Sequence, residues 1–352
     1  MNKKLGFAYW GFCEEYEDSA IVETPDGGRF TRPLFVKEMT RHGIKVIALQ
    51  QKRETKPIKE LDFSSYYPDI DALFVEWRWP TWKNDSSNPN HKSETHETDL
   101  DRQTALMNYY HGKIPIIVWD TDLKVTDEDI KNYPQVTWLE PTILHDRHFF
   151  GTLLYFSDLK IRMRPTNPDN RYIYVGSNYE RYWGVDKYYF SIAHELRHKG
   201  ITTDFYGNWL NYSPERPEQE ERVKYYSSRI NFHKRNAFLE GMQLINKSIT
   251  TTHIVKKEYC RKGLITPRFF ESIMAGTPAF IPEEFIVPLY GYDWVIRGTN
   301  IDIFDSIFWQ LHGTSEVGRL KMVEEQIKNI REILPECDVV NVPDKIKKIL
   351  GW

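Results

Sequence analysis

Two side chains of opposite charge in the second half of the chain have the types and spacing to hold a nucleotide. Arg268 and Glu271 stand three residues apart in the segment TPRFFE, in which Thr266 is a good N-cap and Pro267 suits a first helical position. On a helix that begins there, they share one face, where an arginine can bind phosphate and a glutamate the ribose hydroxyls. A plain salt bridge fits the same spacing. The small residues and apolar strand that follow, 275–281, favour the nucleotide.

A glycine follows each of two predicted strands in the same half. Gly176 comes directly after residues 172–175, and Gly207 after 201–206. A glycine at this place lets backbone N–H groups approach an anion, and Ser177 and Arg181 can donate to phosphate oxygens. Taken alone, the segment fits an ordinary tight turn with a surface arginine at least as well.

Two carboxylates follow the most apolar strand of the first half. Asp120 comes directly after residues 114–119, and Asp122 stands two positions further on. A carboxylate at the end of a buried strand can act as general base on an acceptor hydroxyl. For either aspartate taken singly, capping or a solvated turn is an equally good explanation.

One metal motif occurs, at His194-Glu195-Leu196-Arg197-His198. On a helix, the two histidines of an HExxH motif can bind zinc with the glutamate as base, and an acid among residues 218–221 could be a third ligand. Only three positions of the motif are fixed and the helix ends at Gly200, so a chance match on a surface helix is the more frequent outcome.

Three tryptophans and an arginine lie between residues 77 and 82. Such a loop could stack on a base or a sugar. A loop that packs on itself is the more common arrangement.

Short apolar runs alternate with helix-like segments along most of the chain. Runs that are apolar on both faces and separated by helices are typical of buried parallel strands. The sequence therefore predicts an α/β protein with two doubly wound domains that face a cleft, and ligands beyond the carboxyl ends of the strands. The predicted strands are 5–10, 44–49, 72–75, 114–119, 172–175, 201–206 and 279–281. The predicted helices are 30–42, 98–111, 187–198, 269–275 and 315–334, and the predicted polar connections are 161–171 and 213–222.

The composition is that of an ordinary globular protein. The chain has 352 residues and a net charge of −3, with 40% hydrophobic and 28% charged residues, which excludes collagen, coiled coil and long disorder. At roughly 150 residues per domain, the length fits two domains. No apolar run approaches the roughly 20 residues of a membrane helix, and no signal peptide is recognised. Three scattered cysteines without a CxxC pair predict a reducing compartment, the cytoplasm.

Residues 263–285 resemble the donor-binding segment of the phage DNA β-glucosyltransferase family. The family pattern I-T-x-R-x-x-E-[ST] corresponds to residues 265–272, and its E-E-F to residues 283–285, without a gap. Three further segments resemble the family's G-S phosphate loop (176–177), its G-[LI]-x-x-[ED]-F-[FY]-G-N segment (200–208) and the strand that ends in its catalytic aspartate (113–120).

The resemblance implies a GT-B fold and an inverting transfer from a UDP-sugar, with UDP-glucose as the first expectation. It implies an N-terminal, acceptor-binding Rossmann-like domain over 1–165 and a C-terminal, nucleotide-sugar-binding one over 166–335. Residues 336–352 would pack back on the N-terminal domain. A monomer is expected, and a divalent cation is compatible with the sequence but not required by it.

The same resemblance implies a role for each candidate residue. Arg268 and Ser177 would bind the diphosphate, Arg181 would add positive charge, and Glu271 would bind the ribose. Gly176 and Gly207 would belong to the backbone of the donor site. Asp120 becomes the base if the strand is aligned without a gap, and Asp122 if the Thr-Asp pair shared with the family is aligned instead.

The implied acceptor is a hydroxymethylated pyrimidine such as 5-hydroxymethylcytosine, flipped out of duplex DNA, with Lys160, Arg162, Arg164 and the tryptophan loop as DNA contacts. Two features depart from the family. The family is basic whereas this chain carries −3, and residues 27–32 lack the family's glucose-holding glutamate, with only Glu23 and Asp26 nearby. Two alternatives therefore remain, a GT-B enzyme acting on a glycan or small molecule, and a sugar-nucleotide-binding module without catalysis.

Overall fold

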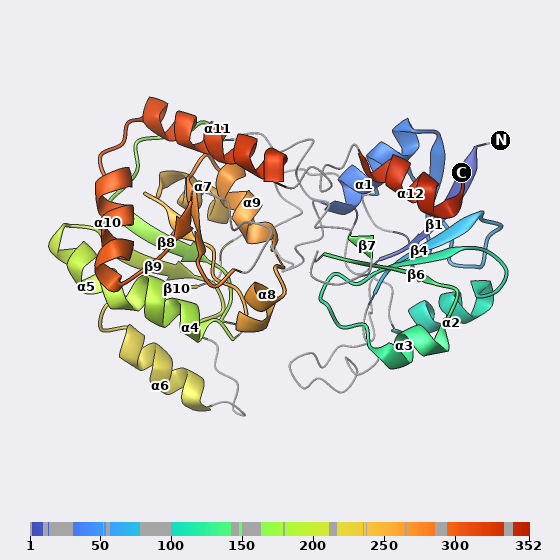
Figure 1. Cartoon of the computed structure of the whole chain (residues 1–352), viewed down its shortest axis with the longest axis horizontal. Coiled ribbons are helices and arrows are strands. Elements are labelled where there is room, and N and C mark those ends of the chain that lie inside the picture. The colour runs from blue at the N-terminus through green and yellow to red at the C-terminus, as the bar shows by residue number, and fades with distance from the viewer. Residues whose placement is uncertain are drawn as a thin grey trace. The chain divides into compact units, whose positions relative to one another are not determined.

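The chain divides into two compact units, each with its own core (Figure 1). Unit 1 consists of Met1–Glu17, Thr24–Ser157 and Glu336–Trp352, and unit 2 of Asp18–Glu23 and Asp158–Pro335. The computed structural model describes residues 2–9, 13, 31–51, 53, 57–77, 100–141, 148–149, 163–178, 180–210, 217–234, 236, 238–264, 266–285, 294–333 and 341–352.

Unit 1 is built on a seven-stranded sheet in which every pair of neighbouring strands is parallel. The strands lie in the order β3-β2-β1-β4-β5-β6-β7, the doubly wound order that reverses direction between β1 and β4. The strands are β1 (Lys3–Ala8), β2 (Ile44–Ala48), β3 (Leu61–Phe63), β4 (Ala72–Glu76), β5 (Ile116–Trp119), β6 (Thr137–Glu140) and β7 (His148–Phe149). The helices are α1 (Thr31–Arg41), α2 (Leu100–Tyr110), α3 (Asp127–Asn132) and α12 (Val342–Leu350).

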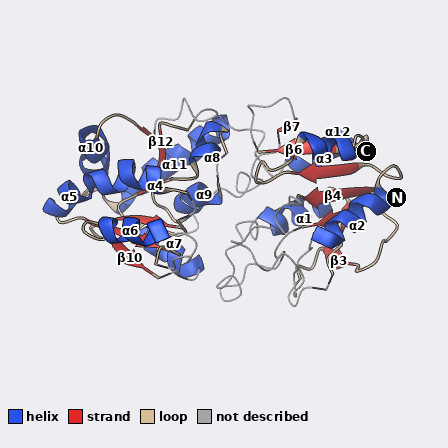
Figure 2. Ribbon diagram, turned by 90° about the horizontal axis from the view of Figure 1, so that it is seen from below, coloured by secondary structure: helices blue, strands red, loops and turns tan. Residues whose placement is uncertain are grey.

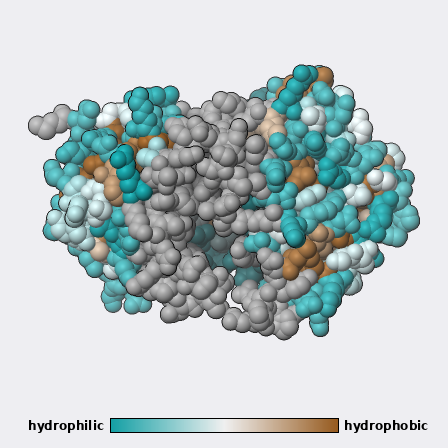
Figure 3. Space-filling model, turned by 180° about the vertical axis from the view of Figure 1, so that it is seen from behind, coloured by the Kyte–Doolittle hydropathy of each residue, from teal (hydrophilic) through white to brown (hydrophobic). Residues whose placement is uncertain are grey.

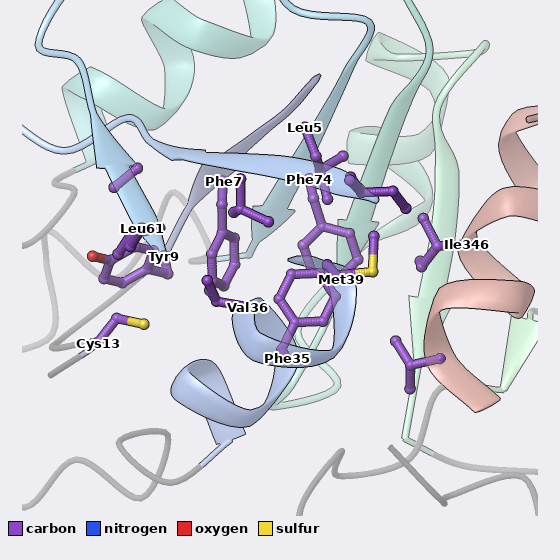
Figure 4. Packing of buried hydrophobic residues seen from close by; sticks show 14 of the residues in the cluster. Leu5, Phe7, Tyr9, Cys13, Phe35, Val36, Met39, Leu61, Phe74 and Ile346 are labelled. Carbon is purple, nitrogen blue, oxygen red and sulfur yellow. The ribbon is translucent and has the colours of Figure 1, made fainter. Parts of the chain in front are cut away.

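Both faces of this sheet are covered. Helices α1 and α12 lie on one face and α2 and α3 on the other (Figure 1). On the first face Phe7, Phe35 and Phe74 pack together, and Ile346 of α12 joins the same cluster (Figure 4). This burial on both sides explains why β4 and β5 are apolar without alternation.

Unit 2 contains two parallel three-stranded sheets joined edge to edge. Their orders are β10-β9-β8 and β11-β12-β13, and an isolated bridge between Tyr172 and Thr250 connects β8 to the chain entering β11. The combined order is again the doubly wound one, with its reversal between β8 and β11. The strands are β8 (Arg171–Val175), β9 (Thr202–Tyr206), β10 (Asn231–His233), β11 (Thr251–Thr252), β12 (Ala279–Pro282) and β13 (Val295–Ile296).

Helices cover the strands of unit 2 as well (Figure 2). Helix α7 contacts β8 and α9, and α9 contacts β12 and α11, whereas α5 contacts β9 and α10. The helices are α4 (Tyr182–Val185), the π-helix η4 (Asp186–Phe190), α5 (Ser191–His198), α6 (Pro217–Tyr226), α7 (Phe238–Lys247), α8 (Lys257–Arg261), α9 (Pro267–Met274), α10 (Asn300–Leu311) and α11 (Glu316–Ile333).

The predicted α/β class and parallel strands are confirmed, with two local differences. Residues 213–222 were expected to form a polar loop, but α6 begins at Pro217; its apolar side is only Val223 and Tyr226, too little for a periodic pattern. The predicted helix 187–198 begins earlier, as α4, and passes through the π-helical turn η4 before α5.

The surface of the described residues is mostly hydrophilic on the face drawn in Figure 3. Among the helices that the structure describes, none is long and apolar enough to cross a membrane.

Candidate active site

The glycines after β8 and β9 bring the ends of these two strands into direct contact. The Gly176 N–H donates to the Tyr206 carbonyl at 2.8 Å, and the Trp209 indole N–H donates to the Gly176 carbonyl at 2.6 Å. Gly207 has a φ of 148°, and a Cβ there would lie 2.2 Å from the Gly176 oxygen. Only glycine fits this close approach at position 207. A Cβ at Gly176 would lie 2.7 Å from the Tyr174 hydroxyl oxygen.

A hydrogen bond within the loop after Gly176 joins two of the predicted donor residues. The Arg181 guanidinium donates through Nη1 to the Ser177 carbonyl, and Ser177 is half-buried. Glu180 has a φ of 50°, in the left-handed region that non-glycine residues rarely adopt. Local strain of this kind costs about 1–3 kcal/mol and concentrates at functional sites.

Arg268 and Glu271 form an ion pair on the first turns of α9, with 2.9 Å between Arg268 Nη1 and Glu271 Oε2. The Glu271 side chain is 4% exposed and that of Arg268 is 38% exposed. The alternative of a salt bridge is thus present in the structure. It does not exclude a ligand, because a guanidinium carries five N–H donors and can bridge a carboxylate and a phosphate.

Three of the predicted donor residues, from the β8 loop and from α9, lie near enough to Tyr174 for their charges to act on it. Burial raises the pKa of this tyrosine, while the charges of Arg181 and Arg268 act to lower it and that of Glu271 to raise it. All three side chains are therefore close enough to act on one hydroxyl group, beside the reversal point between β8 and β11. Doubly wound sheets bind their ligands at this position.

Thr266 does not cap α9 as predicted. Its side chain makes no capping hydrogen bond, and Oγ1 lies 3.3 Å from Nε2 of His253, the residue directly after β11. Burial, together with the charges of Arg181 and Arg268, lowers the pKa of His253 to about 3. Sequence reasoning missed this histidine because a lone histidine has no partner at a diagnostic spacing.

In unit 1, the Asp120 carboxylate holds the loop that follows β5. Its Oδ1 accepts from the Lys124 N–H at 2.8 Å and its Oδ2 from the Val125 N–H at 2.7 Å. Within this loop Leu123 has a φ of 55°. Asp120 is 2% exposed, and burial raises its pKa to about 6 although both backbone donors lower it. The alternative of a capping role thus describes Asp120 well.

Asp122 is half-buried in the same loop and, with Glu140 at the end of β6, raises the pKa of Asp120. The structure therefore brings both predicted aspartates together with a third acid that the sequence analysis did not single out. Asp122 is the more accessible of the two predicted residues.

Two other sequence hypotheses fare less well. Trp77 is buried and packs edge-on against Trp138, with 5.5 Å between ring centroids, so it belongs to the core rather than to a stacking surface; residues 78–82 lie outside the described part of the chain.

His194 and His198 do face each other, with 2.9 Å between their Nε2 atoms. Within the described residues, however, no three His, Cys, Asp or Glu side chains are grouped to hold a metal ion.

Of the three basic residues proposed for DNA, the structure describes Arg164. Its side chain is 90% exposed and lies 3.6 Å from Glu316. Lys160 and Arg162, like Glu23, Asp26 and residues 27–30, fall outside the described ranges.

Comparison with solved structures identifies the fold as GT-B, that of many glycosyltransferases. An α-glucosyltransferase in complex with UDP and a 13-mer DNA is similar over 100% of both chains, with a TM-score of 0.62 and 10% identity. Anabaena HepE in complex with UDP-glucose is similar over 99% of both chains (TM-score 0.51, 9% identity), and a Rickettsia africae glycosyltransferase over 99% of this chain and 98% of its own (TM-score 0.52, 10% identity). No protein-family profile and no curated protein matches the chain in sequence.

Proposed function

We propose that the protein is a glycosyltransferase that transfers a sugar from a UDP-sugar, with inversion, to the hydroxymethyl group of a modified pyrimidine in duplex DNA. The sugar first expected is glucose. The protein would act as a monomer in the cytoplasm, that of the host if a phage encodes it. A divalent cation is compatible with this proposal and is not needed for it.

The observation that carries the donor half is the ion pair of Arg268 and Glu271 at 2.9 Å on α9, with Arg181 near enough to act on the same Tyr174 hydroxyl. Two guanidinium groups supply the charge that a diphosphate requires, and a buried carboxylate can accept hydrogen bonds from ribose hydroxyls. The GT-B neighbours bound to UDP or UDP-glucose support the same assignment.

For the base we favour Asp122 over Asp120. Both oxygens of the Asp120 carboxylate already accept backbone N–H groups of the loop, so moving it would release the loop. Asp122 is carried by that loop and is half-buried. Asp120 then acts as a positioning residue, and Asp122 takes the proton of the attacking hydroxyl as the bond to the anomeric carbon forms and UDP leaves.

The DNA acceptor is supported by the family resemblance and by the neighbour that contains DNA. The net charge of −3 instead favours the second candidate, a glycan or small-molecule acceptor. A duplex-DNA binder with this total must rely on local basic patches, and its affinity must fall as salt rises, because each neutralised phosphate releases counterions.

One experiment separates these functions. The protein is incubated with UDP-sugars and with duplex DNA that is plain or hydroxymethylated, and the DNA is digested and its nucleosides weighed. A heavier hydroxymethylpyrimidine supports DNA modification, and NMR of that nucleoside gives the anomeric configuration, β for inversion and α for retention. UDP release only with a glycan or small molecule supports the second candidate. UDP binding with no transfer to any acceptor leaves a binding module.

A further inference from the structure

His253 is a buried histidine inside the candidate donor site, 3% exposed, and no function has yet been given to it. It directly follows β11, and its backbone N–H donates to the Phe280 carbonyl of β12 at 2.8 Å. Phe269 and Phe285 lie beside its ring, with centroids 5.8 and 5.9 Å away. The backbone of His253 is thus held by β12, and its ring lies beside two aromatic side chains.

The surroundings of His253 keep the imidazole neutral. Arg181 and Arg268 both act on it with positive charge, and burial removes the water that would stabilise a third cation. A neutral imidazole has one N–H and one lone pair, and the Thr266 hydroxyl can rotate to match Nε2 in either tautomer. The Thr266 hydroxyl and His253 Nε2, 3.3 Å apart, can therefore form a hydrogen bond at neutral pH without protonation of the imidazole.

This contact joins the end of β11 to the start of α9, the helix that carries two of the donor groups. Thr266 is the residue before α9, whose second residue is Arg268 and whose fifth is the buried Glu271. Its hydroxyl makes no bond to the helix itself, so it is the imidazole that fixes this side chain. Changing the bond would let the first turn of α9 shift relative to the end of β11.

We propose that His253 is a positioning residue of the UDP-sugar site, which holds Thr266 and thereby sets Arg268 and Glu271 at the distance that the nucleoside diphosphate requires. The inference rests on the proposed donor site and adds a residue to it. The imidazole orients the arginine and the glutamate and does not itself contact the phosphates.

The test uses UDP titration calorimetry with four variants of the full chain and one control variant. His253→Phe keeps a ring beside Phe269 and Phe285 but removes the polar atoms, and Thr266→Val keeps the shape but removes the hydroxyl. The two together complete a double-mutant cycle, and His253→Gln restores a hydrogen-bonding group. Tyr226→Phe is the matched control, because it removes another buried hydroxyl of unit 2, which donates to Asp186 at 2.7 Å.

Each single variant is expected to bind UDP about 3- to 10-fold more weakly, the scale of one hydrogen bond, and the double variant no more weakly than either single one. His253→Gln should recover most of the affinity, and Tyr226→Phe should leave it unchanged while lowering the melting temperature. Wild-type affinity in both single variants, or losses that simply add, would overturn the role of His253 and leave the donor site standing. A wild-type protein that does not bind UDP at all would overturn the proposed function instead.

Discussion

Arg268 Nη1 lies 2.9 Å from Glu271 Oε2, one turn along α9, and this ion pair links two of the three charged residues of the candidate donor site. Arg268 is the more exposed member, so it is the more accessible of the two to a ligand from solvent. The pair also means that removing either residue disturbs the other.

Arg268→Ala should weaken UDP binding by about 10- to 150-fold, the scale of a hydrogen bond to a charged group at 1.5–3 kcal/mol. Titration calorimetry with UDP measures it. Arg229→Ala, which removes a half-buried arginine elsewhere in unit 2, should leave the affinity unchanged. Equal UDP affinity in the Arg268 variant and the control would remove Arg268 from the donor site.

Gly207→Ala should displace the loop after β8, which carries Ser177 and Arg181, while leaving the rest of the fold intact. Its Cβ would meet the Gly176 oxygen at 2.2 Å, so the β8 loop must move. Gly200→Ala is a matched control, since Gly200 has a φ of 77° but a methyl group added there would meet nothing within 4 Å. Both glycines have a positive φ, so each variant loses about 1–3 kcal/mol to backbone strain, measured by urea unfolding. Only Gly207→Ala should also lose UDP affinity, and a similar loss in both would mean that strain alone is responsible.

Asp122→Asn should lower transfer by about 10²- to 10⁴-fold with UDP affinity unchanged, because it removes the proton acceptor. Asp120→Asn should instead lower the melting temperature, since an amide has one acceptor oxygen where the carboxylate uses two to bind the loop. Initial rates and thermal melts of both variants test this. Normal turnover in Asp122→Asn together with an inactive, stable Asp120→Asn would assign the base to Asp120.

The sequence predicted most of the strands that are apolar on both faces, because burial leaves a continuous run such as 114–119. It could not predict β10 or β11, whose two or three residues are mostly polar and are held by neighbouring strands rather than by their own pattern. Arg268 and Glu271 were recognised because their spacing is local. His253 acts on Thr266 across 13 positions, and only the folded chain brings them together.

Stability should fall in acid through His253. In the unfolded chain this histidine binds a proton near its ordinary pKa of 6.5, whereas the folded protein does so only near 3. Between these values the unfolded state holds the extra proton. The contribution of the neutral, buried imidazole to the free energy of unfolding is therefore complete above pH 6.5. It is lost by up to about 1.4 kcal/mol per pH unit as the pH falls.

Urea unfolding of wild type and His253→Phe at pH 5 and pH 7 tests this contribution, because the other titrating groups are common to both proteins. The variant should lose less stability than wild type between these pH values. The same pH dependence in both would contradict the lowered pKa.

Ile346→Ala should destabilise unit 1 by about 2–5 kcal/mol, the usual range for truncating a fully buried isoleucine. Chemical unfolding followed by hydrogen exchange would locate the loss, which should spare the amides of unit 2. Uniform loss of protection in both units would show that they unfold together.

The place of α12 also gives the two units a different order of assembly. Unit 2 is encoded almost wholly by Asp158–Pro335, whereas unit 1 needs Glu336–Trp352 as well as the start of the chain. Everything that unit 2 requires is therefore translated before Val342 and Ile346, which fill the core of unit 1. Unit 1, whose synthesis begins first, therefore cannot complete its core until the whole of unit 2 has been translated, and until then the sheet face that α12 covers lacks this helix.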